Sequence, residues 1–171
     1  GVAMTEVLWL GRGGQGAFTA AKLLGAAYVL KGSSFHALAF PSFGPERRGA
    51  PVRAFTKLDT KPVLDRSETE KADYIIILDD TLYSESLANH LKENGRIIIN
   101  SKTISGDNIT AYDAEKIASG LKLPTVNTVM LGIAASLSGI TGLDELSGAI
   151  NQYMPEKIRA KNITAVREAF E

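Results

Sequence analysis

The chain has 171 residues, no cysteine, and 19 basic residues against 19 acidic ones, so its formal net charge is zero. The length favours one domain with a sizeable core, and the charge balance argues against a nucleic-acid-binding protein, which needs a basic surface. No apolar run approaches the roughly 18 residues that span a bilayer, and the N-terminus lacks the pattern of a secretory signal. The lack of cysteine excludes disulfides, Cys-ligated zinc and Cys-ligated iron–sulfur clusters in this chain. It is compatible with a cytoplasmic location.

The apolar pattern predicts strands that alternate with helices along the chain. A first strand at residues 7–10 leads through a glycine-rich turn into a helix from residue 14 to about residue 31. Further strands are expected at residues 35–40, 52–56, 72–78, 96–100 and 109–112. Further helices are expected at residues 79–93, 114–119, 127–138, 143–152 and 156–170, and the polar segment 57–71 is expected as a loop or a two-stranded excursion. This order predicts a Rossmann-like three-layer α/β/α sandwich in one domain, residues 1–171, with a largely parallel sheet and a helical C-terminal part.

The turn after the first strand has the sequence GRGGQG, residues 11–16, and fits the dinucleotide fingerprint G-x-G-x-x-G. Glycines permit a tight turn and the close approach of a ligand, and the N-terminus of the following helix favours an anion. A dinucleotide site also needs an acidic residue about 20 positions further on, for a ribose hydroxyl. The first carboxylate after Glu6 is Glu46, and Lys31 and His36 occupy the region where that acid would stand. The motif alone therefore leaves three readings open: a redox dinucleotide site, including an NADP-like variant, a tight structural turn, or a site for another anion or partner.

A second motif, PSFGPERRGAP at residues 41–51, combines turn-forming residues with an acid and two arginines. A surface loop is the simplest interpretation. Arginine also offers planar, multi-donor recognition of carboxylate or phosphate, so the loop is suited to binding.

The remaining sequence offers no complete set of catalytic groups. The two histidines, His36 and His90, do not have the spacing of metal ligands. Asp79 and Asp80 follow a buried strand and could bind Mg²⁺, although a helix cap is the more common role for such residues. We therefore assign no catalytic residue and no metal ligand.

The two motifs together resemble the gamma subunit of 2-oxoacid:ferredoxin oxidoreductases, the family that includes pyruvate synthase. The family pattern is close to G-x-G-G-Q-G followed by a GPE-x-R-G-G-P-like loop, and Ala50 stands where the family commonly has glycine. The stretch that begins at Asn127 is similar to the family's Asn-x-x-x-Leu-Gly segment, and Asn162 fits its usual C-terminal asparagine. The resemblance covers nearly the whole chain in the right order.

This resemblance implies a subunit of a cytoplasmic oxidoreductase that acts on the oxo group of a 2-oxoacid of the pyruvate or 2-oxoglutarate type. Such a complex oxidatively decarboxylates the oxoacid on thiamine diphosphate, forms acyl-CoA and passes electrons through iron–sulfur clusters to ferredoxin. Thiamine diphosphate, Mg²⁺ and the clusters are expected on the alpha, beta and ferredoxin-like delta subunits, with CoA as co-substrate. No nucleic acid and no membrane is implied, and the isolated chain is expected to be inactive.

The resemblance also directs attention to residues that could hold an anionic group of CoA or contact a partner subunit, two roles that the sequence leaves equally open. These candidates are Gly11, Arg12, Gly13, Gly14, Gln15, Gly16, Glu46, Arg48 and Asn127. The alternative function is a free-standing Rossmann-like nucleotide-binding or regulatory module, which would not need the second motif.

Overall fold

The strand β1 (Thr5–Arg12) lies inside the sheet, and its apolar run at residues 7–10 is buried on both faces. Val7 and Trp9 are fully buried in one core, while Leu8 and Leu10 belong to a second core on the other side of the sheet. Side chains alternate between the faces of a strand, so an uninterrupted apolar run indicates a strand that is covered on both sides.

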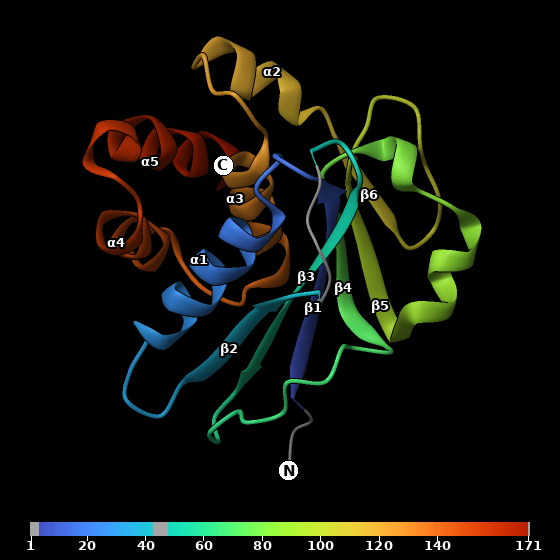
Figure 1. The fold of residues 1–171 in the computed structure, drawn as a ribbon, viewed down its shortest axis with the longest axis horizontal. Helices are drawn as coiled ribbons and strands as arrows, with labels where there is room; N and C mark the ends of the chain where they lie inside the picture. The colour runs from blue at the N-terminus through green and yellow to red at the C-terminus, as the bar shows by residue number, and fades with distance from the viewer. Residues whose placement is uncertain (1–3, 43–47, 171) are drawn as a thin grey trace.

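The computed structural model describes residues 4–42 and 48–170, and these form one six-stranded sheet with α-helices packed against it (Figure 1). The strands that join β1 are β2 (His36–Pro41), β3 (Pro51–Asp59), β4 (Ala72–Ile77), β5 (Leu91–Asn100) and β6 (Ile109–Tyr112). Their order in the sheet is β2-β3-β1-β4-β5-β6. β1, β4, β5 and β6 are parallel, whereas β3 is antiparallel to both of its neighbours. The prediction of an α/β fold with a largely parallel sheet is confirmed.

The α-helices gather on one face of the sheet, as Figure 1 shows. They are α1 (Ala17–Val29), α2 (Ala114–Gly120), α3 (Asn127–Ser138), α4 (Leu143–Tyr153) and α5 (Glu156–Phe170). Each contributes buried residues to the core that contains Trp9 of β1. The helical C-terminal part predicted from the sequence is therefore confirmed, with bounds within three residues of those expected.

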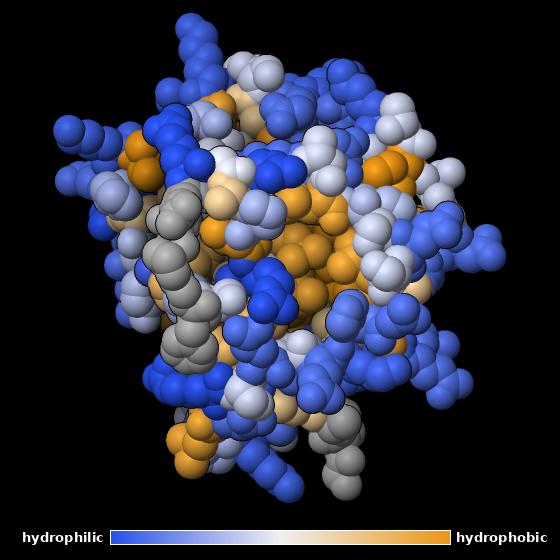
Figure 2. Space-filling view, turned by 45° about the vertical axis from the view of Figure 1, so that its right-hand side comes forward, coloured by the Kyte–Doolittle hydropathy of each residue, from blue (hydrophilic) through white to orange (hydrophobic). Residues whose placement is uncertain are grey.

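The layer on the other face consists of 3-10 helices and irregular segments. Two 3-10 helices, η1 (Asp80–Leu82) and η2 (Glu85–His90), supply Leu82 and Leu87 to the second core. Figure 2, which brings the right-hand side of Figure 1 forward, shows an apolar hollow on this side of the molecule. The three-layer arrangement thus has its α-helices in one outer layer and shorter elements in the other.

The α-helix expected at residues 79–93 is wrong, because the segment divides into η1, η2 and the start of β5. The backbone of Tyr83 between the two 3-10 helices is extended, with φ −73° and ψ 137°, which interrupts helical hydrogen bonding. Leu91 pairs with Ala72 of β4, so β5 begins five residues before the strand start expected at residue 96.

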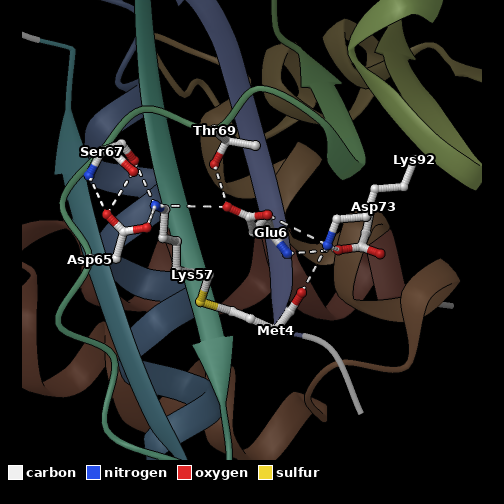
Figure 3. A network of polar contacts seen from close by, with 8 residues as sticks. All are labelled: Met4, Glu6, Lys57, Asp65, Ser67, Thr69, Asp73 and Lys92. Carbon is white, nitrogen blue, oxygen red and sulfur yellow. Dashed lines mark hydrogen bonds and ion pairs between the residues drawn. The ribbon is translucent and has the colours of Figure 1, made fainter. Parts of the chain in front are cut away.

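The irregular segment 60–71, which we call the strap, connects β3 to β4 and is fixed by a buried lysine (Figure 3). Lys57 of β3 has a side chain that is only 1% exposed. Its Nζ donates to the Ser67 carbonyl oxygen at 2.6 Å and lies 3.4 Å from Asp65 Oδ2 and 3.8 Å from Glu6 Oε1. The loop interpretation of this region holds from residue 60, while Lys57 itself belongs to a strand.

Candidate functional site

The glycine-rich turn joins the carboxyl end of β1 to the start of α1. Gly14 and Gly16 have φ of 92° and 81°, a left-handed conformation that glycine adopts without steric cost. Gln15 closes the turn with both its side chain and its backbone. Its side-chain Oε1 accepts from the Arg12 N–H at 2.7 Å, and its backbone N–H donates to the Arg12 carbonyl at 3.0 Å. A compact backbone turn therefore precedes the first turn of α1.

The second sequence motif lies directly beside this turn. The Gly13 N–H donates to the Ala50 carbonyl at 2.8 Å, and the Gly49 N–H donates to the Gly13 carbonyl at 3.1 Å. A β-bridge also pairs Gly13 with Arg48. The two motifs are about 35 residues apart in the sequence and form one surface, which we call the two-loop site and define as residues 11–16 and 48–50. Glu46, the remaining candidate of this motif, lies outside the described residues.

Arg12 joins the two loops to the end of β4. Its Nη1 donates to the Gly49 carbonyl at 3.1 Å, its Nη2 donates to Thr81 Oγ1 at 3.0 Å, and its Nε lies 3.6 Å from Asp79 Oδ2. Gln15 Nε2 donates to the same Asp79 oxygen at 3.1 Å. The guanidinium is therefore engaged within the chain on several sides, whereas the side chain of Arg48 is exposed.

Asp79 stays ionised in this arrangement. Its partial burial raises its pKa, but hydrogen bonds from the Thr81 hydroxyl and N–H and from the Gln15 amide outweigh burial, together with the attraction of Arg12, and lower the pKa of this carboxyl below its ordinary value. Sequence reasoning placed Asp79 as a helix cap or a Mg²⁺ ligand. It does cap η1, and its contacts with residues 12 and 15 give it a further role in the site.

Asn127, at the start of α3, supports the glycine-rich turn from the α-helical side. Its Nδ2 donates to the Gly16 carbonyl at 3.3 Å, and its Oδ1 accepts from the Thr125 hydroxyl at 2.7 Å and from the Thr128 N–H at 2.9 Å. The Thr128 hydroxyl in turn donates to Asn162 of α5 at 2.6 Å. Both asparagines singled out in the sequence therefore belong to one buried polar chain that leads from α5 to the turn.

The amino end of α1 faces no acidic side chain within its own first turn. Gly16 stands at the N-cap position without a side-chain cap, and the first turn of the helix contains no carboxylate. A β-carbon added to Gly14 would lie 4.0 Å from Arg48 Cγ, so the arginine stem passes next to the turn. Free N–H groups, the helix dipole and a nearby guanidinium are the features with which proteins bind phosphate.

A cleft of about 390 Å³ is bordered by Gln15 and lies at the carboxyl ends of β4 and β5. Its lining includes Asp79, Asp80, Asp113 and Glu115, with Lys102 as the basic residue. This excess of carboxylates disfavours an anion inside the cleft. The favourable position for an anion is consequently the side of the two-loop site that carries Arg48.

Within residues 4–42 and 48–170, no group of three or more His, Asp or Glu side chains is arranged to hold a metal ion. Among the same residues, no helix has both the length and the apolar character needed to cross a membrane.

Comparisons with known proteins agree over nearly the whole length of the chain. A family model described as pyruvate ferredoxin/flavodoxin oxidoreductase matches residues 6–171. The pyruvate synthase subunit PorC of Methanothermobacter marburgensis is 42% identical over 173 residues, which cover 98% of this chain and 97% of that protein. The pyruvate/ketoisovalerate oxidoreductases common subunit gamma of Pyrococcus furiosus is 37% identical over 180 residues, which cover 98% of this chain and 96% of that protein.

Two solved structures share the fold. The pyruvate oxidoreductase subunit PORC of Thermotoga maritima superposes with a TM-score of 0.82 at 30% identity and covers 99% of this chain and 96% of its own. The 2-oxoglutarate:ferredoxin oxidoreductase of Magnetococcus marinus, with 2-oxoglutarate, coenzyme A and succinyl-CoA bound, superposes with a TM-score of 0.78 at 18% identity. That match covers 99% of this chain and 31% of the longer one, and at this identity it shows the fold alone.

Proposed function

The chain belongs to the pyruvate ferredoxin/flavodoxin oxidoreductase family as one of its gamma subunits, and from this premise we propose that it works in a complex that oxidatively decarboxylates a 2-oxoacid to an acyl-CoA. The oxoacid is of the pyruvate or 2-oxoglutarate type, and the electrons pass to ferredoxin. We propose that this complex works in the cytoplasm.

The redox chemistry in this proposal belongs to partner chains. Alpha and beta subunits carry thiamine diphosphate with Mg²⁺, and a ferredoxin-like delta subunit carries the iron–sulfur clusters. Ligation of such clusters requires cysteine thiolates, and this chain has none. The relatives over 35% identical are themselves named as subunits, and the chain matches them over nearly their whole length, which favours this function over a free-standing nucleotide-binding module.

The two-loop site is the part of this chain that we assign to CoA. The observation that carries the assignment is the pairing of Gly13 with Arg48 and Ala50, because it brings the stem of the exposed Arg48 side chain next to the turn that precedes the uncapped amino end of α1. A phosphate of CoA offers the negative charge and acceptor oxygens that suit this position. Arg12 holds the loops together in this proposal, and Arg48 is the residue that contacts the anion. CoA as the ligand class is part of this proposal; the Magnetococcus marinus complex, one chain of which shares the fold, has coenzyme A bound.

The experiment compares Arg48→Ala, Arg48→Lys and Arg167→Ala in the assembled complex. Arg167 is an exposed arginine on α5, outside the two-loop site, and serves as the matched control. Loss of a charge-assisted hydrogen bond is worth about 1.5–3 kcal/mol, so Arg48→Ala should raise KM for CoA roughly tenfold or more. Arg48→Lys should recover part of the affinity, and KM for the oxoacid should stay unchanged.

Gly14→Ala adds a second, independent probe, because a methyl group at φ 92° strains the turn next to Arg48. If both Arg48→Ala and Gly14→Ala leave the affinity and KM for CoA at the level of Arg167→Ala, the CoA assignment is wrong. A loss of co-purifying subunits with unchanged CoA kinetics would instead assign the same residues to a subunit contact.

A further inference from the structure

The carboxylate of Asp79 links segments that are far apart in the sequence. Its Oδ1 accepts from the Thr81 N–H at 3.0 Å and from the Thr81 hydroxyl at 2.6 Å, which fixes the rotamer of the side chain. Its Oδ2 points toward the glycine-rich turn and contacts Gln15 Nε2 at 3.1 Å and Arg12 Nε at 3.6 Å. One oxygen is thus held by the corner after β4, and the other is presented to the two-loop site.

Both contacts of Oδ2 continue into the loops. Gln15, held by Asp79, uses its Oε1 to accept from the Arg12 N–H and so closes the turn. Arg12, held by Asp79, uses Nη1 to donate to the Gly49 carbonyl in the second loop. The position of each loop therefore depends on the same carboxylate, once through an amide and once through a guanidinium.

We propose that Asp79 is the positioning residue of the two-loop site: it fixes Gln15 and Arg12, and through them it sets the spacing between the amino end of α1 and Arg48 at which CoA is bound. The inference rests on the proposed function for its ligand and adds a residue to which neither sequence motif points. Asp79 contacts no ligand in this account. Its effect reaches CoA only through the geometry of the loops.

Asp80 provides a matched control on the adjacent position. It has the same charge and also borders the cleft, but its Oδ2 accepts from the Ser101 hydroxyl at 2.8 Å, on the β5 side. Asn substitution at either position keeps the size of the side chain and removes the charge. A difference between the two variants therefore reports on the contacts of Asp79 with the loops rather than on the loss of a negative charge near the cleft.

The test measures two quantities in Asp79→Asn and Asp80→Asn. In the isolated chain, hydrogen exchange of the Gly13 and Gly49 amides reports on the pairing of the loops. In the assembled complex, steady-state kinetics separate KM for CoA from kcat and from KM for the oxoacid. A coupling of about 1 kcal/mol, within the range found for residues in one hydrogen-bond network, corresponds to a factor of about five, and we expect Asp79→Asn to raise amide exchange and KM for CoA by at least this factor. We expect kcat and KM for the oxoacid to change less than about twofold, and Asp80→Asn to behave like the wild type.

The double variant Asp79→Asn with Arg12→Gln, compared with the two single variants, forms a double-mutant cycle. If Asp79 acts through Arg12, the effects of Asp79→Asn and Arg12→Gln on KM for CoA are strongly non-additive. The inference is overturned if Asp79→Asn resembles Asp80→Asn in both measurements. It is also overturned if KM for CoA responds to Arg48→Ala but not to Asp79→Asn, a result that leaves the proposed function intact. If Arg48→Ala and Asp79→Asn both leave KM for CoA unchanged, the assignment of the two-loop site to CoA and the inference fall together.

Discussion

Gly16 is the residue at which the glycine requirement of the turn is most severe. Its φ of 81° lies in the left-handed region, and a β-carbon there would overlap Asn127 Nδ2. Asn127 cannot withdraw freely, because its Oδ1 accepts from the Thr125 hydroxyl and the Thr128 N–H. The glycine therefore combines a backbone requirement with a close approach of α3.

We predict that Gly16→Ala lowers the free energy of unfolding by about 1–2 kcal/mol from the left-handed conformation alone, with an added cost from the displaced Asn127. Gly120→Ala is the matched control, because no heavy atom lies within 4 Å of an added β-carbon there and its φ is not positive. Urea denaturation followed by circular dichroism measures both variants. Equal stability of Gly16→Ala and Gly120→Ala would contradict both the strain of the left-handed conformation and the close approach of Asn127.

The candidate site could be predicted from the sequence only in part. GRGGQG predicts a turn before a helix, and the resemblance singles out residues of both motifs as candidates for a CoA or subunit contact. The contacts that assemble them connect Arg12 with Gly49 and Thr81, over 37 and 69 positions, and no local pattern reports such pairs. Asp79 was visible as an acid after a buried strand, at the end where parallel strands place functional groups. That Asp79 contacts the two-loop site could not be predicted, because it depends on β4 lying beside β1 in the sheet.

At the scale of elements, the strap illustrates how a polar segment is fixed to an apolar sheet. Lys57 is buried next to Phe40, with its ammonium 5.5 Å from the ring centroid. Its Nζ reaches the Ser67 carbonyl, while Glu6 connects it to Lys92, whose Nζ lies 3.5 Å from Glu6 Oε2 (Figure 3). A buried ammonium is costly without hydrogen-bond acceptors, and the strap provides them through the Ser67 carbonyl and the Asp65 carboxylate. The same contacts fix the strap to the sheet.

We predict that Lys57→Met lowers the free energy of unfolding by about 1–3 kcal/mol, because the Ser67 carbonyl and the Glu6 carboxylate each lose a partner. Lys61→Met, an exposed position in the strap, should change stability by less than about 0.5 kcal/mol. Chemical denaturation measures both, and limited proteolysis of the strap should be faster in Lys57→Met alone. A Lys57→Met variant as stable and as resistant as Lys61→Met would contradict this role.

The pH dependence of the strap has a definite sign. Hydrogen bonds from the Ser67 hydroxyl and N–H, with the attraction of Lys57, lower the pKa of Asp65 to about 2. A carboxyl whose pKa is lowered by folding contributes stability above its ordinary value of about 4, and this contribution is lost as the pH falls from there through the folded value. The contribution of the Asp65 carboxylate to stability should accordingly be constant between pH 5 and 8 and should decline only below about pH 4.

The elements were predictable to different degrees for identifiable reasons. The buried strands and the C-terminal helices carry uninterrupted or periodic apolar residues, and their predicted bounds agree with the structure to within a few residues. The predicted helix after β4 does not agree with the structure. Leu82 and Leu87 pack on the sheet from 3-10 helices, and Leu91 pairs with β4 as the start of β5. Tertiary pairing there overrides helix propensity. Likewise, the Ala114 N–H at the start of α2 donates to Asn100 Oδ1 of β5 at 3.0 Å. This contact cannot be predicted from the sequence next to the helix.

At the scale of the whole molecule, the chain combines one α-helical layer with a sheet face covered by short elements. The two-loop site lies at the end of β1, between strands whose connections leave in opposite directions, where open α/β sheets form a crevice for ligands. This chain contributes a preassembled surface at that crevice, and the thiamine and cluster chemistry of our proposal lies on partner chains. The central claim is therefore about assembly: the protein acts as one subunit of a 2-oxoacid oxidoreductase.

The most direct test purifies the affinity-tagged chain from its native host, identifies the proteins that accompany it, and assays the purified material with a panel of 2-oxoacids and a reducible viologen dye. The account predicts co-purification of chains that carry thiamine diphosphate and iron–sulfur clusters, with dye reduction that requires both an oxoacid and CoA. A chain that is recovered alone, without oxoacid-dependent reduction, and that binds a nicotinamide nucleotide by itself would contradict it.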